Sequence, residues 1–301
     1  MQAKVEKSDK VDNLDQHFST TSLVGDGFMG IRALFWNIEN FRGDNADRTR
    51  AAAEHIRAFD PHIVGFSEIG SKRAIRNLMM EELSDFDFGI TDGIQAIELM
   101  AGWKRGFFEQ ALYTQRREFK AGSDGQRPGA LLSVKHAGSF LNFLFLHTDS
   151  GRGNRDYENR REMFGKISKL RRALNDIEGG TAKFVVMGDL NTMGRDALPG
   201  EDAITSDEEI TGLARFMARG DMTLYEKSHP TTFLQYFSNG TVEFNTDLDH
   251  VIASDVTPLA DLGGGKKVRV RGWNDLATDN DRKVWTETLS DHASVEIEID
   301  L

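Results

Sequence analysis

The sequence predicts an α/β protein in which two β-sheets pack face to face and helices cover their outer sides. Strand-like apolar segments and amphipathic helical segments are interspersed along the 301 residues, and no internal repeat divides them. Several apolar segments end in polar side chains, which are spread from residue 37 to residue 292. A single site can use these side chains only if the segments fold together, so we expect one large domain rather than two.

The first expected element of the domain is a strand over Ile31–Asn37. The polar residues 1–28 contain Gly, Asp and Ser near their end and are expected to be a disordered leader or tail, which leaves residues 29–301 for the domain. Apolar residues recur at helical spacing in Arg48–Phe59, and Asp60-Pro61 ends this helix. The next expected elements are the strand Ile63–Ser67 and the helix Lys72–Leu83.

The middle of the chain is rich in strand signals. Turn sequences such as Thr91-Asp92-Gly93 and His136-Ala137-Gly138 separate its short apolar segments. A long basic amphipathic helix is expected over Asp156–Asn175, and Gly179-Gly180 ends it. The expected strands before this helix are Phe86–Ile90, Ala96–Met100, Gln110–Thr114, Ala130–Lys135 and Phe140–His147.

The last third of the chain begins with an apolar β-branched run that ends at Asp189. Its acidic connection, residues 192–230, is expected to hold a short helix over roughly Asp207–Ala218. Lys266–Trp273 alternates basic and apolar residues and is a further strand or a loop, whereas His292–Ile299 has the period-two pattern of a closing strand. The other expected strands are Thr231–Gln235 and Leu248–Ala253.

Composition narrows the classes of function. The net charge of −11 argues against a protein that coats nucleic acid through a broad basic surface, but it leaves room for a local patch and a divalent cation. The chain has no Cys, which excludes disulfides and thiolate metal sites. No apolar run approaches the roughly 20 residues of a membrane helix. The lack of Cys and of a visible signal peptide favours a cytoplasmic location.

The most informative motif is Gly188-Asp189-Leu190-Asn191. Side chains alternate along an extended chain, so Asp189 and Asn191 point the same way from the end of a buried strand. An acid beside an amide suits a site that holds both a metal-bound water and a phosphate oxygen. The other polar groups at strand ends are Asn37, Glu68, His147, Asp249-His250 and Ser290-Asp291-His292.

Five of these motifs resemble those of the endonuclease/exonuclease/phosphatase superfamily, and they occur in order over residues 31–299. Each motif alone is weak evidence, but five in order are strong evidence. The resemblance implies a DNase I-like four-layer α/β/β/α sandwich with the site at the strand ends between the two sheets. The motifs are Phe35-Trp36-Asn37-Ile38, Phe66-Ser67-Glu68-Ile69, Gly188-Asp189-Leu190-Asn191, Leu248-Asp249-His250-Val251 and Ser290-Asp291-His292.

The resemblance also implies a metal site. Glu68 would be the principal Mg²⁺ ligand, Asn37 would support the metal or its water, and Asp291 would complete the cluster. These hard oxygen ligands fit Mg²⁺, with Mn²⁺ or Ca²⁺ as alternatives, rather than structural zinc.

Catalytic roles follow from the same resemblance. Asp189 would orient or deprotonate the attacking water, and Asn191 would hold a phosphate oxygen. His292 would stabilise the charge that builds on the phosphate, and Asp249 would hold His292 in one tautomer. His250 is expected to be structural.

A second acid–base pair is implied by the segment Phe107–Tyr113, which is similar to a DNase I segment in which a Glu pairs with a His. The pair here would be Glu109–His147, with His147, or a metal-bound water, protonating the leaving oxygen. DNase I has a tyrosine where this chain has Phe107, and it has disulfides, so its substrate contacts are not implied here.

Two basic segments are candidate substrate surfaces. Arg152 and Arg155 lie in a Gly-rich loop after His147, which suits bidentate phosphate binding. The helical arginines could instead form a solvated face that pairs with Glu158 and Glu162. They are Arg160, Arg161, Arg171 and Arg172. The segment Lys266–Trp273 could stack on and neutralise a nucleic acid, or it could be an edge strand guarded by charge.

We therefore expect a Mg²⁺-dependent phosphodiesterase, in the first place an endonuclease that binds DNA or RNA. A phosphatase or lipid phosphodiesterase of the same superfamily is the alternative, and an inactive scaffold that serves as a binding module is the alternative from another class. Each residue also has a structural reading by itself: Asn37 and Asn191 as turn formers, His147 as a satisfied core histidine, and Asp291 as a cap.

Overall fold

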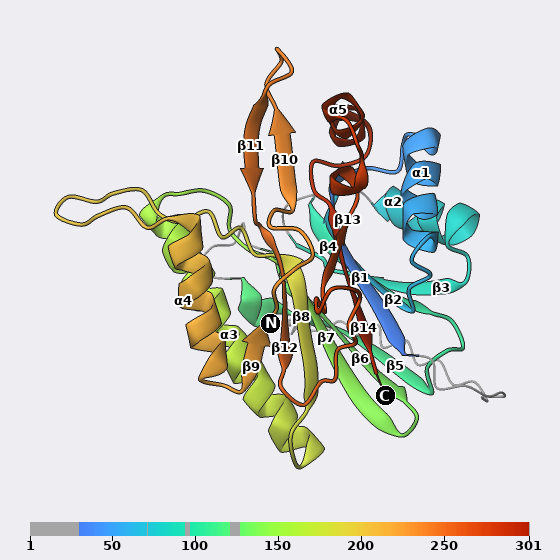
Figure 1. Cartoon of the computed structure of the whole chain (residues 1–301). Coiled ribbons are helices and arrows are strands. Elements are labelled where there is room, and N and C mark those ends of the chain that lie inside the picture. The colour runs from blue at the N-terminus through green and yellow to red at the C-terminus, as the bar shows by residue number, and fades with distance from the viewer. Residues whose placement is uncertain (1–29, 71, 94–96, 121–126, 301) are drawn as a thin grey trace, which may run out of the picture.

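The structure, a computed structural model, describes residues 30–70, 72–93, 97–120 and 127–300. Two six-stranded sheets face each other, and helices lie on both outer sides (Figure 1). This four-layer α/β/β/α arrangement confirms the expected fold class. The expected leader over residues 1–28 lies outside the described residues.

The first sheet supplies one side of the site. Its strand order is β13-β14-β1-β2-β4-β3. The central strands β1 and β2 are parallel, and Asn37 pairs with Ser67 at the ends of their shared ladder. The strands are β1 (Ile31–Phe41), β2 (Ile63–Ile69), β3 (Phe86–Ile90), β4 (Glu98–Lys104), β13 (Arg269–Arg271) and β14 (Ser294–Ile299).

The second sheet has a similar centre. Its order is β5-β6-β7-β8-β12-β9, and the central strands β7 and β8 are parallel, with His147 paired to Asp189. A separate hairpin, β10–β11, projects beyond the sheets (Figure 1). The strands are β5 (Gln110–Arg116), β6 (Gly129–His136), β7 (Ser139–His147), β8 (Lys183–Asp189), β9 (Met222–Leu224), β10 (Phe233–Tyr236), β11 (Val242–Thr246) and β12 (Asp249–Ser254).

A helix connects each central parallel pair, as parallel strands require. Helix α1 joins β1 to β2, and α3 joins β7 to β8. None of the helices in the described part of the chain is long and apolar enough to cross a membrane. The helices are α1 (Ala46–Arg57), α2 (Lys72–Asn77), α3 (Asn154–Glu178), α4 (Ser206–Ala218) and α5 (Asp279–Thr288), with short 3₁₀ or π turns at Leu78–Glu82, Arg117–Phe119 and Trp273–Asp275.

The main core lies between the two sheets. Phe35 of β1 stacks on Phe145 of β7 with ring centroids 6.2 Å apart. Gly65 of β2 lets the sheets approach this closely, because a Cβ there would lie 2.1 Å from the Phe145 ring. Two outer cores fix α1 and α2 on the first sheet and α3 and α4 on the second. The strand ends that carry polar residues are therefore held at the same edge of the sandwich.

Several elements differ from the sequence expectations. The helix expected over Lys72–Leu83 is α2 followed by a π turn, and α5 was not expected because it has no continuous apolar face. Residue 96 of the expected strand Ala96–Met100 lies outside the described residues, and β4 begins at Glu98. The segment Lys266–Trp273 contains β13, an edge strand of the first sheet.

Candidate active site

Polar side chains from both sheets meet at the shared edge. The Asn37 amide joins the sheets: its Nδ2 donates to Asp189 Oδ2 at 2.9 Å and to Glu68 Oε1 at 3.2 Å. The same nitrogen lies 3.4 Å from His292 Nε2. His147 Nε2 lies 3.5 Å from Asp189 Oδ2 and 3.9 Å from Glu68 Oε1. Five side chains predicted from distant segments therefore lie within reach of one phosphate group.

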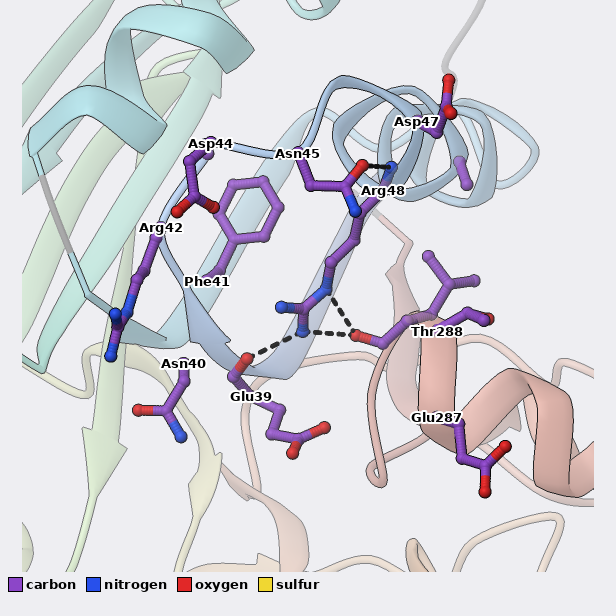
Figure 2. A pocket seen from close by; sticks show the side chains of 13 residues that line it. Glu39, Asn40, Phe41, Arg42, Asp44, Asn45, Asp47, Arg48, Glu287 and Thr288 are labelled. Atoms are coloured by element: carbon purple, nitrogen blue, oxygen red, sulfur yellow. Dashed lines mark hydrogen bonds between the residues drawn. The ribbon is translucent and has the colours of Figure 1, made fainter.

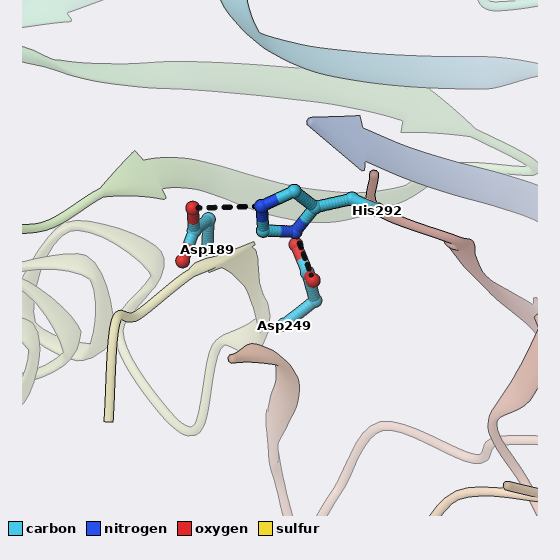
Figure 3. A group of neighbouring side chains, drawn as sticks. All are labelled: Asp189, Asp249 and His292. Carbon is cyan, nitrogen blue, oxygen red and sulfur yellow. Dashed lines mark hydrogen bonds and ion pairs between the residues drawn. The ribbon is translucent and has the colours of Figure 1, made fainter. Parts of the chain in front are cut away.

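One part of this site is a buried acid–base group (Figure 3). Asp249 Oδ2 lies 2.7 Å from His292 Nδ1, and His292 Nε2 lies 3.8 Å from Asp189 Oδ2. Burial alone would lower the pKa of His292, but the Asp249 carboxylate and its hydrogen bond, together with Asp189, raise it to about 10. Burial raises the pKa of Asp189 to about 7. A charged imidazolium thus faces a carboxyl group whose pKa is close to neutral pH.

By its composition the group of Asp189, Asp249 and His292 could hold a metal ion, since its ligand atoms lie within 4.8 Å of one another. Its hydrogen bonds favour acid–base work instead. Asp249 engages His292 Nδ1, while the two Asp189 oxygens accept from Asn37 Nδ2 and from the Asn191 backbone N–H, the latter at 3.0 Å.

A second group of oxygens, from Asn37, Glu68 and Asp291, lies at the ends of β1 and β2 and just before β14. The Glu68 and Asp291 side chains are 21% and 23% exposed, whereas that of Asp189 is 2% exposed. Burial, together with the nearby Glu39 and Glu68 carboxylates, raises the pKa of Asp291 to about 6 despite the opposing effect of His292. A divalent cation among these oxygens would relieve that repulsion, so the residues present fit a hard cation held by Glu68, Asn37 and Asp291.

Strained backbone positions these ligands. Glu39, Asn40 and Glu68 have φ values of 42°, 45° and 62°, in the left-handed region that L residues seldom adopt. The Glu39 N–H donates to Asn37 Oδ1 and the Asn40 N–H donates to Glu68 Oε2, both at 3.1 Å. The backbone turn that interrupts the β1–β2 ladder therefore aims both side chains.

Asn191 and His250 lie behind the acid–base group. The Asn191 side chain donates to the Thr148 carbonyl at 3.2 Å and lies beside Asp189, which leaves it near the position of a bound phosphate. His250 contacts Thr192 Oγ1 at 2.8 Å and Lys227 Nζ at 3.1 Å. His250 thus supports the loop after Asn191, in agreement with its expected structural role.

The expected pair between Glu109 and His147 does not form. Glu109 lies before the first residue of β5, where its Oε1 accepts from the Gly138 N–H at 2.9 Å and its Oε2 lies 3.6 Å from Lys135 Nζ. Gly138 is in the turn that begins β7, whereas His147 is the last residue of β7. The two side chains are at opposite ends of the sheet because β5 runs antiparallel to β6 and β6 runs antiparallel to β7.

The arginines are less available than the sequence suggested. Arg152 donates to Asp196 Oδ1 at 2.8 Å and to the Met193 carbonyl at 2.6 Å, so it is tied to the loop after Asn191. Arg155 is exposed at the start of α3. Arg160 and Arg171 are buried rather than on a solvated face.

The positive charges of the two arginines in β13 are also neutralised. Arg269 and Arg271 both pair with Glu296, a fully buried carboxylate, at 2.6 Å and 2.5 Å, and Trp273 is buried. The segment therefore contains a charged edge strand, one of the two alternatives expected from the sequence, and its use as a nucleic-acid surface stays a prediction.

Arg127 is a site residue that the sequence analysis missed. It precedes β6, and its Nε donates to the Ile97 carbonyl at 3.0 Å. Burial lowers the pKa of His147 well below its usual value, and the Arg127 cation lowers it further. The start of β6 lies beside the end of β7 because the two strands are antiparallel. Knowledge of that pairing would have placed Arg127 next to His147.

The two-sheet fold is that of DNase I-like proteins. A model of the Endonuclease/Exonuclease/phosphatase family matches residues 34–292, and the chain belongs to this family. Members typically use divalent metal ions. A search of curated protein sequences gave no match.

Solved structures share the fold at low identity. The chain is similar to truncated Caenorhabditis elegans TDP2 (TM-score 0.63, 16% identity, 90% of this chain and 98% of that one). It is also similar to AP endonuclease LMAP from Leishmania major (TM-score 0.63, 16% identity, 91% and 88%). A third is the Bacteroides thetaiotaomicron mannosyl-6-phosphatase Bt3783 (TM-score 0.58, 16% identity, 90% and 100%). These likenesses establish the fold alone.

Proposed function

We propose that this protein is a divalent-metal-dependent phosphoesterase, in the first place a nuclease that hydrolyses phosphodiester bonds of DNA or RNA. The observation that carries the proposal is the position of Asn37. One amide nitrogen lies within hydrogen-bonding distance of Glu68, on the metal side, and of Asp189, on the acid–base side. A phosphate placed there would touch both groups at once.

The side chains divide the chemistry among them. Asp189, with its pKa near 7, takes a proton from the attacking water. His292 stays protonated at neutral pH and stabilises the charge that develops on the phosphate, while Asn191 holds a phosphate oxygen. A divalent ion held by Glu68, Asn37 and Asp291 would supply further charge neutralisation when bound.

His147 has a different role from the one expected. Because its pKa is lowered well below 6.5, His147 is neutral at neutral pH and carries no spare proton for a leaving oxygen. Its Nε2 lies 3.5 Å from Asp189 Oδ2, so we assign it to orienting Asp189. The leaving oxygen then takes its proton from solvent.

Aromatic side chains beside the site favour a nucleic acid. The Phe233 ring meets the His292 ring edge-on, with centroids 5.0 Å apart. Phe244 is placed by the β10–β11 register on the same face of the hairpin as Phe233, and it is 49% exposed. Exposed aromatic rings can stack on bases without regard to sequence. The exposed Arg155 adds a cation at the start of α3.

A phosphatase that acts on a smaller phosphoester is the second candidate. The neutralised arginines favour it, since Arg152 pairs with Asp196 and both arginines of β13 pair with Glu296. The net charge of −11 has the same implication, because few free cations are left to follow a long polyanion.

The cytoplasmic location expected from the sequence stays a prediction.

A panel of substrates tests the proposal. Plasmid DNA, RNA, bis-p-nitrophenyl phosphate and an inositol phosphate are each incubated with Mg²⁺, Mn²⁺ or EDTA. Plasmid nicking or RNA cleavage that EDTA abolishes supports the nuclease. Monoester release without cleavage of nucleic acid supports the phosphatase. No hydrolysis of any substrate, together with no metal binding, supports an inactive scaffold and contradicts the proposal.

A further inference from the structure

A single arginine outside the polar cluster connects two of its segments. Arg48 lies in the first turn of α1, and its Nη2 donates to the Ile38 and Glu39 carbonyls, both at 2.7 Å. The same guanidinium donates to the Leu289 carbonyl from Nη2 at 2.6 Å and from Nε at 3.1 Å. Figure 2 shows this side chain reaching toward Glu39 and the end of α5.

Each carbonyl that Arg48 holds belongs to a segment next to a ligand. Ile38 and Glu39 follow Asn37 directly, and Leu289 lies two residues before Asp291. Arg48 is therefore hydrogen-bonded to the segments that carry two of the three proposed ligands. Asn37 is in β1, and Asp291 lies just before β14, the strand next to β1.

The segment held by Arg48 is also the strained one. Glu39 and Asn40 are consecutive non-glycine residues with left-handed φ, a combination that persists only when neighbouring structure enforces it. The N–H groups of these two residues hold Asn37 Oδ1 and Glu68 Oε2. If the carbonyls were released, the turn could relax and both ligand side chains would lose their backbone donors.

We infer that Arg48 is a positioning residue that fixes the metal ligands Asn37, Glu68 and Asp291 through the backbone. This inference rests on the metal site of the proposed function. The guanidinium reaches the three carbonyls from Nη2 and Nε, two atoms of one rigid plane, whereas Lys has a single nitrogen on a flexible stem; Lys at this position therefore keeps the charge but not the geometry. The test variant should keep the positive charge at this position. Loss of that charge would by itself favour cation binding, because four carboxylates lie near Arg48: Glu39, Asp44, Glu68 and Asp291.

The affinity for Mn²⁺ distinguishes a role of Arg48 in positioning the ligands from a role in stability alone. We expect Arg48→Lys to raise the Kd for Mn²⁺, measured from the free-ion electron paramagnetic resonance signal, by about 10–100-fold, as is usual when a partner of a metal ligand is lost. The matched control is Arg50→Lys on the same helix, since Arg50 is exposed and pairs only with Asp47; its Kd should stay within about twofold of wild type. Circular dichroism confirms folding of each variant.

Arg48→Ala with an added small cation gives a second test, because the cation can restore the missing donors. The pocket beside Arg48, with a volume of about 650 Å³ and lined by Glu39, Asn40 and Glu287, opens to solvent and can admit a small ion. Added guanidinium should therefore lower the Mn²⁺ Kd of Arg48→Ala, whereas methylammonium should not.

The outcomes distinguish this inference from the proposed function. A folded Arg48→Lys protein with a lower melting temperature and an unchanged Kd would show a merely structural role and overturn the inference. Wild-type protein that binds no Mn²⁺ would overturn the inference together with the metal site. If wild type binds Mn²⁺ with an Arg48-dependent Kd and hydrolyses no phosphoester, the inference stands and the proposed function falls.

Discussion

The two halves of the site are built differently, although each is centred on the ends of a parallel strand pair, β1–β2 or β7–β8. The β1–β2 half, which we call the open half, carries Glu68 and, from the segment before β14, Asp291; their side chains are 21% and 23% exposed. The β7–β8 half, which we call the closed half, carries Asp189, only 2% exposed. Asp189 lies beside Asp249 of β12, which is fully buried. We infer from this difference that the open half leaves access for an ion and its water, whereas the closed half keeps water away from Asp189 and His292.

Each half also has its own arginine. Arg48 holds the open half and is itself partly exposed. In the closed half Arg160 is fully buried, and its Nε and Nη2 donate to Glu209 at 2.8 Å and 2.9 Å. Arg160 also donates to the Gly151 and Gly194 carbonyls, both at 2.7 Å, which lie in the loops after β7 and β8. The closed half is therefore anchored by a buried ion pair.

The largest effect is expected from breaking that ion pair. Arg160→Met leaves the Glu209 carboxylate buried without its partner, which should reduce the free energy of unfolding by about 3–5 kcal/mol. Arg161→Met is the control, because Arg161 is exposed and its described contacts are with Glu158 and the Tyr157 ring; it should change stability by less than about 0.5 kcal/mol. Urea unfolding measures both. Equal, small losses would mean that Arg160 does not anchor the closed half.

Removing an acid–base side chain should impair turnover but not ion binding. We expect Asp189→Ala and His292→Ala to remain folded and to lower turnover by at least about 10²–10³-fold, the usual loss when one electrostatic donor is removed. Hydrolysis of bis-p-nitrophenyl phosphate at saturating Mg²⁺ measures the change. Near wild-type hydrolysis by either variant would contradict its assigned role.

The open half also contains an acid-sensitive histidine behind its strands. His55 packs between Trp36 and Trp285, and burial, with help from Arg271 and Arg269, lowers its pKa to about 3. Because the unfolded-state pKa is about 6.5, the unfolded chain binds the extra proton first, so stability falls as pH drops from about 6.5 toward 3, by at most about 1.4 kcal/mol per pH unit. His55→Gln should reduce this slope in urea unfolding at pH 6.5, 5.5 and 4.5. An unchanged slope would show that His55 is not the source.

The smallest effect is expected at Glu109. Its carboxylate contacts Gly138 and Lys135 at the far end of the second sheet, so Glu109→Gln should leave turnover within about twofold of wild type, as for other surface substitutions. A loss comparable to that of His292→Ala would restore the discarded Glu109–His147 pair.

The sequence alone predicted the parts of this comparison that depend on local patterns. Apolar strands that end in Asn37, Glu68 and Asp189 are recognisable because side-chain alternation and strand direction are local properties. Glu109 was misplaced because the similarity of its segment to DNase I does not reveal which end of β5 lies beside His147.

Other misses also depend on tertiary pairing. Arg160 was expected on a solvated face because helical spacing does not show that α4 and Glu209 cover it. Arg127 was missed because its proximity to His147 follows from the antiparallel pairing of β6 with β7. The Glu39–Asn40 turn was missed since left-handed φ at non-glycine residues leaves no sequence signal.

The most direct test of the account compares one charge-removing variant from each half in a single titration. Mn²⁺ affinity and phosphodiester turnover are measured for wild type, Glu68→Gln and Asp189→Asn. Glu68→Gln should weaken Mn²⁺ binding at least about tenfold and regain part of its turnover at high Mn²⁺. Asp189→Asn should bind Mn²⁺ nearly as wild type does and stay inactive at any concentration. If Asp189→Asn loses the ion and Glu68→Gln retains it, the assignment of the two halves is wrong.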